Sequence, residues 1–248
     1  MPTEAASMAG LTALVLVAAV LYSSVGHAGA SGYLAAMALF GATPAAMKPT
    51  ALVLNILVAI VGTVRFASAG YTPWPLLLPL CFGSIPAAFV GGAIALPAHV
   101  YEPLLAVLLV LAALRLWFPG NSSVARSRPS FAGFVIVGVV LGMAAGLTGI
   151  GGGVFLSPVL ILTGWEDPRR AAGASAPFIL ANSVSGLLGH ISAAQAVPPQ
   201  AAGLVVVALA GGLFGSWLGA RRFQPRALKR VLAIVMVIAS TKLLAAAF

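Results

Sequence analysis

Two glycine-rich stretches, each accompanied by hydroxyl side chains, contain the residues of this chain best suited to binding chemistry. The first reads Ser23-Ser24-Val25-Gly26-His27-Ala28-Gly29-Ala30-Ser31-Gly32, and the second reads Gly146-Leu147-Thr148-Gly149-Ile150-Gly151-Gly152-Gly153. Glycine lets the backbone turn and exposes its N–H groups, and a helix that follows the turn points the positive end of its dipole at it. Two such stretches brought together would form a cradle for a small anion.

Other hydrogen-bond donors lie near these stretches. Among them, the asparagine at position 55 recurs 127 positions later as Asn182. The alternative interpretation is that the glycines only permit tight turns and close packing, and that the asparagines only join helices. We expect no catalytic residue, no metal ligand and no cofactor. The candidate substrate-binding residues are Ser24, His27, Gly29, Ser31, Asn55, Thr148, Gly149, Gly151, Gly152, Gly153 and Asn182.

Three basic side chains have two interpretations each. Histidine titrates near neutrality, so His27 or His190 could sense or shuttle a proton, although a boundary role is favoured for His190. Lys48 precedes Pro49 at the outer end of an apolar segment. It could attract anions at the mouth of a pathway, but snorkelling to the membrane surface is favoured.

The acidic residues narrow the class of ligand. They are Glu4, Glu102, Glu166 and Asp167, and all lie in loops or at segment ends. Carriers of cations and protons usually keep a carboxylate along their pathway, so this distribution disfavours a sodium or metal carrier. A small anion held by N–H and hydroxyl donors fits better. No Gly-x-x-x-x-Gly-Lys-Ser/Thr pattern for ATP hydrolysis is present.

The elements that hold these residues are membrane segments. With 61% hydrophobic residues, 7% charged residues and a mean hydropathy of +1.09, the chain is typical of an all-α polytopic membrane protein. The net charge of +9 is assigned to cytoplasmic loops rather than to nucleic-acid binding. The first apolar segment lacks a basic flank and a convincing cleavage site, so we expect a retained helix. A single cysteine, Cys81, excludes an intrachain disulfide.

Hydropathy predicts five segments in each half of the chain. Eleven of the 13 Lys and Arg residues then fall on one side of the membrane, with only Lys48 and Lys242 on the other. The positive-inside rule therefore places both termini outside the cell and the linker in the cytoplasm. The expected segments are 8–25, 31–41, 48–66, 75–96 and 101–118, then 131–147, 153–164, 171–190, 200–220 and 227–247.

The halves are also related in sequence, because residues 51–116 recur as 178–243 without a gap. We expect an N-terminal transmembrane repeat (1–118), a cytoplasmic linker (119–130) and a C-terminal repeat (131–248). An odd number of segments makes the repeats inverted, with a transport site between them near the midplane. Whether segments 1–2 and 6–7 are full spans or re-entrant hairpins stays open, since 31–41 and 153–164 are short.

At the glycine stretches the chain resembles the TauE/SafE sulfite exporter family. The resemblance rests on Gly149-Ile150-Gly151-Gly152-Gly153 with Leu156, Ser157 and Pro158, and on the segment from Ala171 to Asn182. The first stretch departs from the family's triple glycine. The resemblance implies export of sulfite, sulfoacetate or a related sulfonate across the cytoplasmic membrane. Some relatives are thought to carry other small anions or to import them.

Other functions remain open from the sequence. The leading hypothesis is a secondary carrier working by alternating access, and an anion channel or an importer is the alternative. Gly29-Ala30-Ser31-Gly32 also spells a rhomboid protease motif, for which His190 would be the base. The spacings Gly138, Gly142, Gly146 and Gly211, Gly215, Gly219 predict close helix packing, within the chain or in a homodimer.

Overall fold

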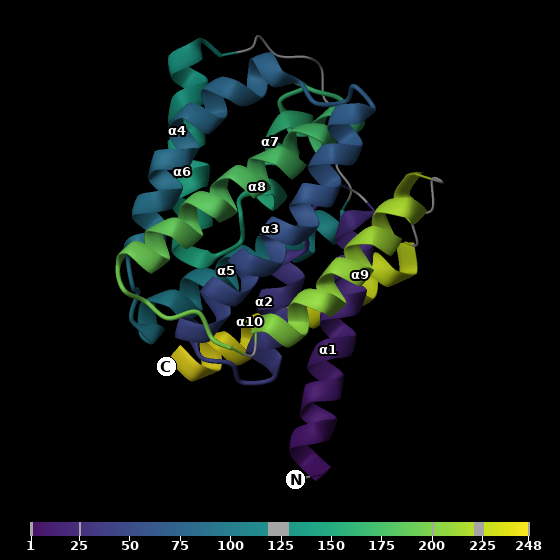
Figure 1. Ribbon diagram of the computed structural model, residues 1–248, viewed down its shortest axis with the longest axis vertical. Coiled ribbons are helices and arrows are strands. Elements are labelled where there is room, and N and C mark those ends of the chain that lie inside the picture. The colour runs from purple at the N-terminus through teal and green to yellow at the C-terminus, as the bar shows by residue number, and fades with distance from the viewer. Residues whose placement is uncertain (1, 25, 119–128, 200, 221–225, 248) are drawn as a thin grey trace.

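The computed structural model describes residues 2–24, 26–118, 129–199, 201–220 and 226–247. In these ranges the chain forms α-helices and no strand, which confirms the expected all-α class (Figure 1). The helices are α1 (Pro2–Ser23), α2 (Ala30–Leu39), α3 (Pro44–Ser68), α4 (Trp74–Ala93), α5 (Ala98–Trp117), α6 (Phe131–Thr148), α7 (Gly153–Leu162), α8 (Pro168–Ser192), α9 (Ala201–Ala220) and α10 (Arg226–Ala247).

The helix ends fall close to the predicted segment ends, except that α1 and α3 begin earlier than predicted. Helix α3 starts at Pro44, behind the extended Thr43, because proline is well suited to the first helical position. Lys48 and Pro49 therefore lie inside this helix rather than at its mouth. Residues 119–128 of the predicted linker lie outside the described residues. Arg221 and Arg222, two of the basic residues assigned to the cytoplasmic side, lie outside them as well.

The order of helix lengths repeats along the chain. Helices α2 and α7 have 10 residues each, α3 and α8 have 25, and α4 and α9 have 20. The helix starts are 127 positions apart for α4 and α9, at 74 and 201, but 124 apart for α3 and α8, at 44 and 168. Asn55 is consequently the twelfth residue of α3, whereas Asn182 is the fifteenth of α8. The inverted orientation of the repeats stays a prediction.

The two halves of the chain interlock. Helix α4 packs chiefly against α6 and α8, α1 against α9, α5 against α10, and α3 against α8. The glycines of α6 allow a close approach to α4: a Cβ at Gly138, Gly142 or Gly146 would lie 2.1–2.2 Å from a carbonyl oxygen of α4. The predicted packing role is confirmed there, and for Gly215, whose Cβ would lie 2.1 Å from Val20 O of α1. The surroundings of Gly219 lie outside the described residues.

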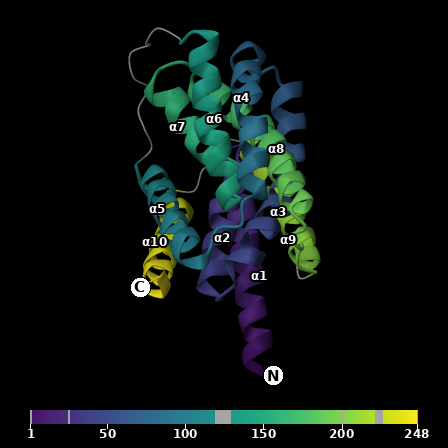
Figure 2. The ribbon, with the colours of Figure 1, turned by 90° about the vertical axis from the view of Figure 1, so that its left-hand side faces the viewer.

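The short helix α2 returns beside α1, the helix that precedes it, whereas α7 packs chiefly against α8, the helix that follows it. Gly32 of α2 faces Ala18 of α1, and Gly10 of α1 faces the ring of Phe40, so the two helices run antiparallel. Ten helical residues rise about 15 Å, half the thickness of the hydrocarbon core. Neither α2 nor α7 can therefore cross a bilayer alone, which favours hairpins. In Figure 2, α1 and α2 occupy the lower part of the molecule and α6 and α7 the upper part.

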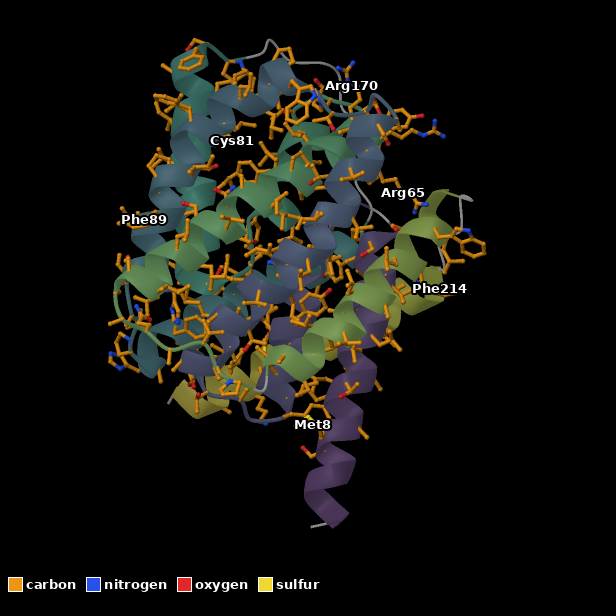
Figure 3. All side chains as sticks on the ribbon, viewed as in Figure 1. Met8, Arg65, Cys81, Phe89, Arg170 and Phe214 are labelled. Carbon is orange, nitrogen blue, oxygen red and sulfur yellow. The ribbon has the colours of Figure 1, made fainter. Side chains whose placement is uncertain are left out.

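The outer surface suits lipid. Five of the described helices, α3, α4, α6, α8 and α9, are long and apolar enough to cross a membrane. Large apolar side chains stand exposed around them, including Phe82 at 70% and Val206 at 69% of full exposure, as membrane contact requires. Figure 3 shows Arg65 and Arg170 toward one end of the molecule and Met8 at the other.

The prediction that Lys48 snorkels to the membrane surface is wrong. Its side chain is buried, and its Nζ donates hydrogen bonds to Gly91 O at 3.1 Å, Gly92 O at 2.7 Å and Ile94 O at 2.9 Å. The last carbonyls of a helix have no intrahelical partner and carry the negative end of the dipole. The amino group of Lys48 satisfies these carbonyls at the end of α4, so its role is internal.

Candidate functional site

Both predicted glycine breaks occur directly before a short helix. Gly29 (φ 105°) precedes α2, and Gly152 (φ 80°) precedes α7; a side chain is disfavoured at both φ angles. No side chain caps either helix. The first N–H groups of a helix have no intrahelical partner, so both N-termini present free donors and a positive dipole end.

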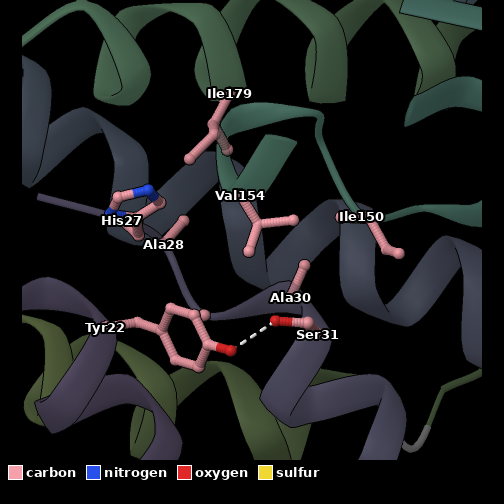
Figure 4. A pocket seen from close by; sticks show the side chains of 9 residues that line it. Tyr22, His27, Ala28, Ala30, Ser31, Ile150, Val154 and Ile179 are labelled. Carbon is pink, nitrogen blue, oxygen red and sulfur yellow. Dashed lines mark hydrogen bonds between the residues drawn. The ribbon is translucent and has the colours of Figure 1, made fainter. Parts of the chain in front are cut away.

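A pocket lies where the two breaks meet (Figure 4). The first break contributes most of its wall, the second contributes Ile150 and α7 contributes Val154, and Ile179 of α8 completes it. The pocket therefore joins the N-terminus of α2 to the first turn of α7. Its free volume is about 10 Å³, room for one water-sized sphere, so this conformation is closed to a four-atom oxyanion. The lining residues are Tyr22, His27, Ala28, Gly29, Ala30, Ser31, Ile150, Val154 and Ile179.

Two tyrosines hold the first break in shape. The hydroxyls of Tyr22 and Ser31 lie 2.5 Å apart, which ties the last turn of α1 to the first turn of α2. Tyr33 donates from its hydroxyl to Ala28 O at 2.6 Å. A Cβ at Gly29 would lie 2.8 Å from that same hydroxyl oxygen, so glycine is needed for the close approach of the tyrosine.

His27 links the first break to the second half of the chain. Its Nε2 lies 2.9 Å from the hydroxyl oxygen of Ser157 in α7. Ser157 in turn lies 2.7 Å from the hydroxyl of Ser175 in α8, and Ser175 donates to Ala171 O at 2.9 Å. The imidazole is thus held by a chain of hydroxyl groups that begins at the pocket wall.

The second break is anchored by neighbouring helices. Asn55 of α3 donates from Nδ2 to Gly149 O at 3.3 Å, and Tyr101 of α5 donates to Thr148 O at 3.0 Å. The Thr148 hydroxyl donates to Ala144 O at 2.6 Å. Gly149 packs against α3, since its Cβ would lie 2.8 Å from Lys48 O. This break is therefore fixed from two sides.

The structure brings only some of the predicted residues to the pocket. His27, Gly29 and Ser31 line it. Gly149, Gly151, Gly152, Gly153, Thr148 and Asn55 lie at or beside the second break without lining the pocket. Ser24, directly after α1, donates back to Leu21 O at 2.7 Å, and Asn182 donates within α8 to Phe178 O at 2.8 Å. The two asparagines, which the repeat relates, thus make different hydrogen bonds.

Sequence reasoning missed Tyr22 and Ser175. Tyr22 could have been found, because it directly precedes the first glycine stretch. Ser175 carries no such signal, because it is one small polar residue in a helix that contains several.

The protease arrangement is not formed. The hydroxyl of Ser31 is bonded to Tyr22, and His190 Nε2 lies 3.2 Å from Ala196 O, so the serine and the histidine have different partners. His190 belongs to the last turn of α8 and contacts the loop that follows, as its predicted boundary role requires. In the part of the chain that the structure describes, no three His, Cys, Asp or Glu side chains form a group that could hold a metal ion.

Comparisons with known proteins identify the family of the chain. A family model described as "Sulfite exporter TauE/SafE" matches residues 11–243. A protein of Sinorhizobium fredii, named "Probable membrane transporter protein y4hK", is 36% identical over 252 residues. The alignment covers 98% of this chain and 100% of that relative. No solved structure matches the chain.

Proposed function

The chain belongs to the sulfite exporter TauE/SafE family of membrane transporters, and from that premise we propose that it exports a small sulfur-containing oxyanion across the cytoplasmic membrane. Sulfite, sulfoacetate and related sulfonates are the proposed substrates. The family description supports sulfite, and the name of the relative supports transport.

One observation carries the proposal that the substrate is an anion: two uncapped helix N-termini, those of α2 and α7, meet at one buried pocket. Free N–H groups and two positive dipole ends favour negative charge. None of the residues that line the pocket is acidic, and His27, Ser31 and Tyr22 add polar groups to its wall. A cation would find no charge of opposite sign in this lining.

The proposed transport cycle is alternating access around this pocket. The water-sized volume, too small for the anion in this conformation, favours a carrier over an open channel. For the pocket to admit an anion, the hairpin of α1 and α2 has to separate from α7 and α8. The bond between His27 and Ser157 spans that boundary, so opening breaks it and closing restores it.

The membrane potential can drive such export. A negative interior favours outward movement of an anion by about 2.3 kcal/mol per charge per 100 mV. With both termini outside and the linker in the cytoplasm, the described arginines Arg65, Arg169 and Arg170 would belong to the cytoplasmic end. A homodimer stays a prediction, and it would need a surface other than the glycine face of α6, which α4 fills.

The test is sulfite flux into and out of proteoliposomes, with and without an imposed potential. Unlabelled sulfonates and sulfate serve as competitors, and empty liposomes as the control. We expect saturable flux with counterflow. The flux should be faster when the imposed potential is positive on the side to which the anion moves. Flux that never saturates would indicate a channel. An absence of flux from protein shown to be folded would refute the proposed substrate class.

A further inference from the structure

A second polar cradle lies beside the pocket, around the α-carbon of Gly151. A Cβ at Gly151 would lie 2.9 Å from the Nδ2 of Asn55 and 2.9 Å from the hydroxyl oxygen of Ser183. Helices α3 and α8 thus place a donor each against the same point of the second break. Gly151 has no side chain, and a Cβ there would come closer to both groups than side-chain carbons normally do, so Asn55 and Ser183 pack directly against its backbone.

The two residues of this cradle each keep one polar atom without a partner, although the Nδ2 of Asn55 is bonded to Gly149 O. Ser183 is completely buried, and its hydroxyl makes no hydrogen bond; Asn55 is completely buried too, and its Oδ1 makes none. Buried polar groups are nearly always paired, and each exception calls for an explanation such as a ligand or a water. Neighbouring serines of the same helix behave normally: Ser185 donates to Ile85 O at 2.6 Å, and Ser175 is bonded to Ser157.

The cradle is adjacent to the pocket. Ile179 lines the pocket, and its Cγ2 would lie 3.0 Å from the same Cβ of Gly151. Ile150, the residue before Gly151, lines the pocket as well. Ile179 of α8 therefore contacts both the pocket and Gly151, and a shift of its side chain would extend the pocket toward Ser183 and Asn55.

We propose that Ser183, together with Asn55, binds an oxygen atom of the transported oxyanion in this cradle. The inference rests on the proposed function and deepens it. The Ser183 hydroxyl donates to the anion, and Asn55 donates its second N–H, the first being used for Gly149 O. Hydrogen bonds from neutral donors to a charged oxygen are strong when water is excluded, so this pair selects for ligands with an oxygen directed at Gly151.

The experiment compares Ser183→Ala with the matched control Ser185→Ala in the sulfite flux assay. Ser183→Ala should raise the KM for sulfite about tenfold, because a hydrogen bond to a charged group is lost. The control keeps the cradle intact, so its KM should match the wild type. Ser183→Cys, which keeps the volume and a weaker donor, should give an intermediate KM.

A second readout separates binding from a structural role. Without sulfite, Ser183→Ala should unfold at the same temperature as the wild type or higher, because the hydroxyl makes no bond in the protein. With sulfite, the wild type should gain thermal stability and Ser183→Ala should gain less. An unchanged KM in Ser183→Ala, or a loss of its thermal stability without sulfite, overturns the inference. The proposed function still stands in that case, provided that the wild-type protein transports sulfite. Wild-type protein that carries no oxyanion refutes both.

Discussion

Ser157 and His27 lie 130 positions apart in the chain, yet their side chains are joined across 2.9 Å. The histidine belongs to the tip of the α1–α2 hairpin, and the serine to α7, beside the other glycine break. The contact orients the imidazole at the pocket wall. The relationship makes Ser157 a positioning residue whose importance can be measured.

We expect Ser157→Ala to slow sulfite transport severalfold, because His27 loses the partner that fixes its ring. Expression and membrane insertion should be unchanged, since the substitution removes one buried hydroxyl and adds no volume. The matched control is Thr163→Ala at the end of the same helix, where the hydroxyl donates only to its own helix, to Val159 O at 2.6 Å. Equal rates for Ser157→Ala and wild type would show that the contact is incidental.

Lys48→Met should destabilise the protein by on the order of 3 kcal/mol, because three buried carbonyl oxygens lose their donor. The measurement is thermal unfolding of purified protein in detergent. Lys242→Met is the control: its Nζ also donates to a carbonyl, Leu39 O at 2.6 Å, but the side chain is exposed, and water can replace it. Similar losses at both positions would contradict the internal role assigned to Lys48.

Gly142→Ala should reduce the yield of folded protein. Its new methyl group would lie 2.2 Å from Ser84 O, so α4 and α6 must move apart, at a cost of about 1–3 kcal/mol or more. Size-exclusion chromatography of a fluorescent fusion reports the folded fraction. Gly203→Ala is the matched control, because nothing lies within 4 Å of its Cβ. A normal chromatogram for Gly142→Ala would mean that the helices are less tightly packed than described.

The proposed orientation can be tested with one engineered thiol. In a Cys81→Ala background, a cysteine in place of Arg126 should resist a membrane-impermeant reagent in intact cells and react after the cells are opened. Cys81 is the native cysteine, half-buried in α4, and its removal makes the labelling specific. A cysteine near the N-terminus should show the opposite behaviour. Labelling of position 126 from outside would reverse the topology.

Much of the fold could be predicted from the sequence, because apolar runs and glycine breaks are local signals. The two breaks at Gly29 and Gly152 occur where the glycines predicted them, and the short helices follow directly. The register within the repeat was harder to predict. A gapless offset of 127 positions matches Asn55 with Asn182. The starts of α3 and α8, however, are 124 positions apart, and those of α4 and α9 are 127 apart, so the three extra residues lie in the connection between α8 and α9.

The candidate site was only partly predictable, because several of its contacts join distant segments. Lys48 resembles a snorkelling residue in sequence, and only the position of α4 shows that its amino group meets three helix-end carbonyls. Ser183 is similar in kind to Ser185, two positions away; the first is unpaired, and the second is bonded to Ile85 O. No local pattern distinguishes the two, since the difference lies in what the neighbouring helices place opposite them.

The interlocked glycine faces of α4 and α6 also set an order of events during synthesis. Helix α4 is complete at residue 93, but α6 is not complete until residue 148. At roughly 5–20 residues per second, the ribosome needs about 3–11 s to add those 55 residues. During that interval the backbone carbonyls that later receive the glycines of α6 face lipid or the insertion machinery. The nascent first half therefore stays incompletely packed until α6 has been synthesised. How long this incompletely packed state lasts depends on the rate of translation.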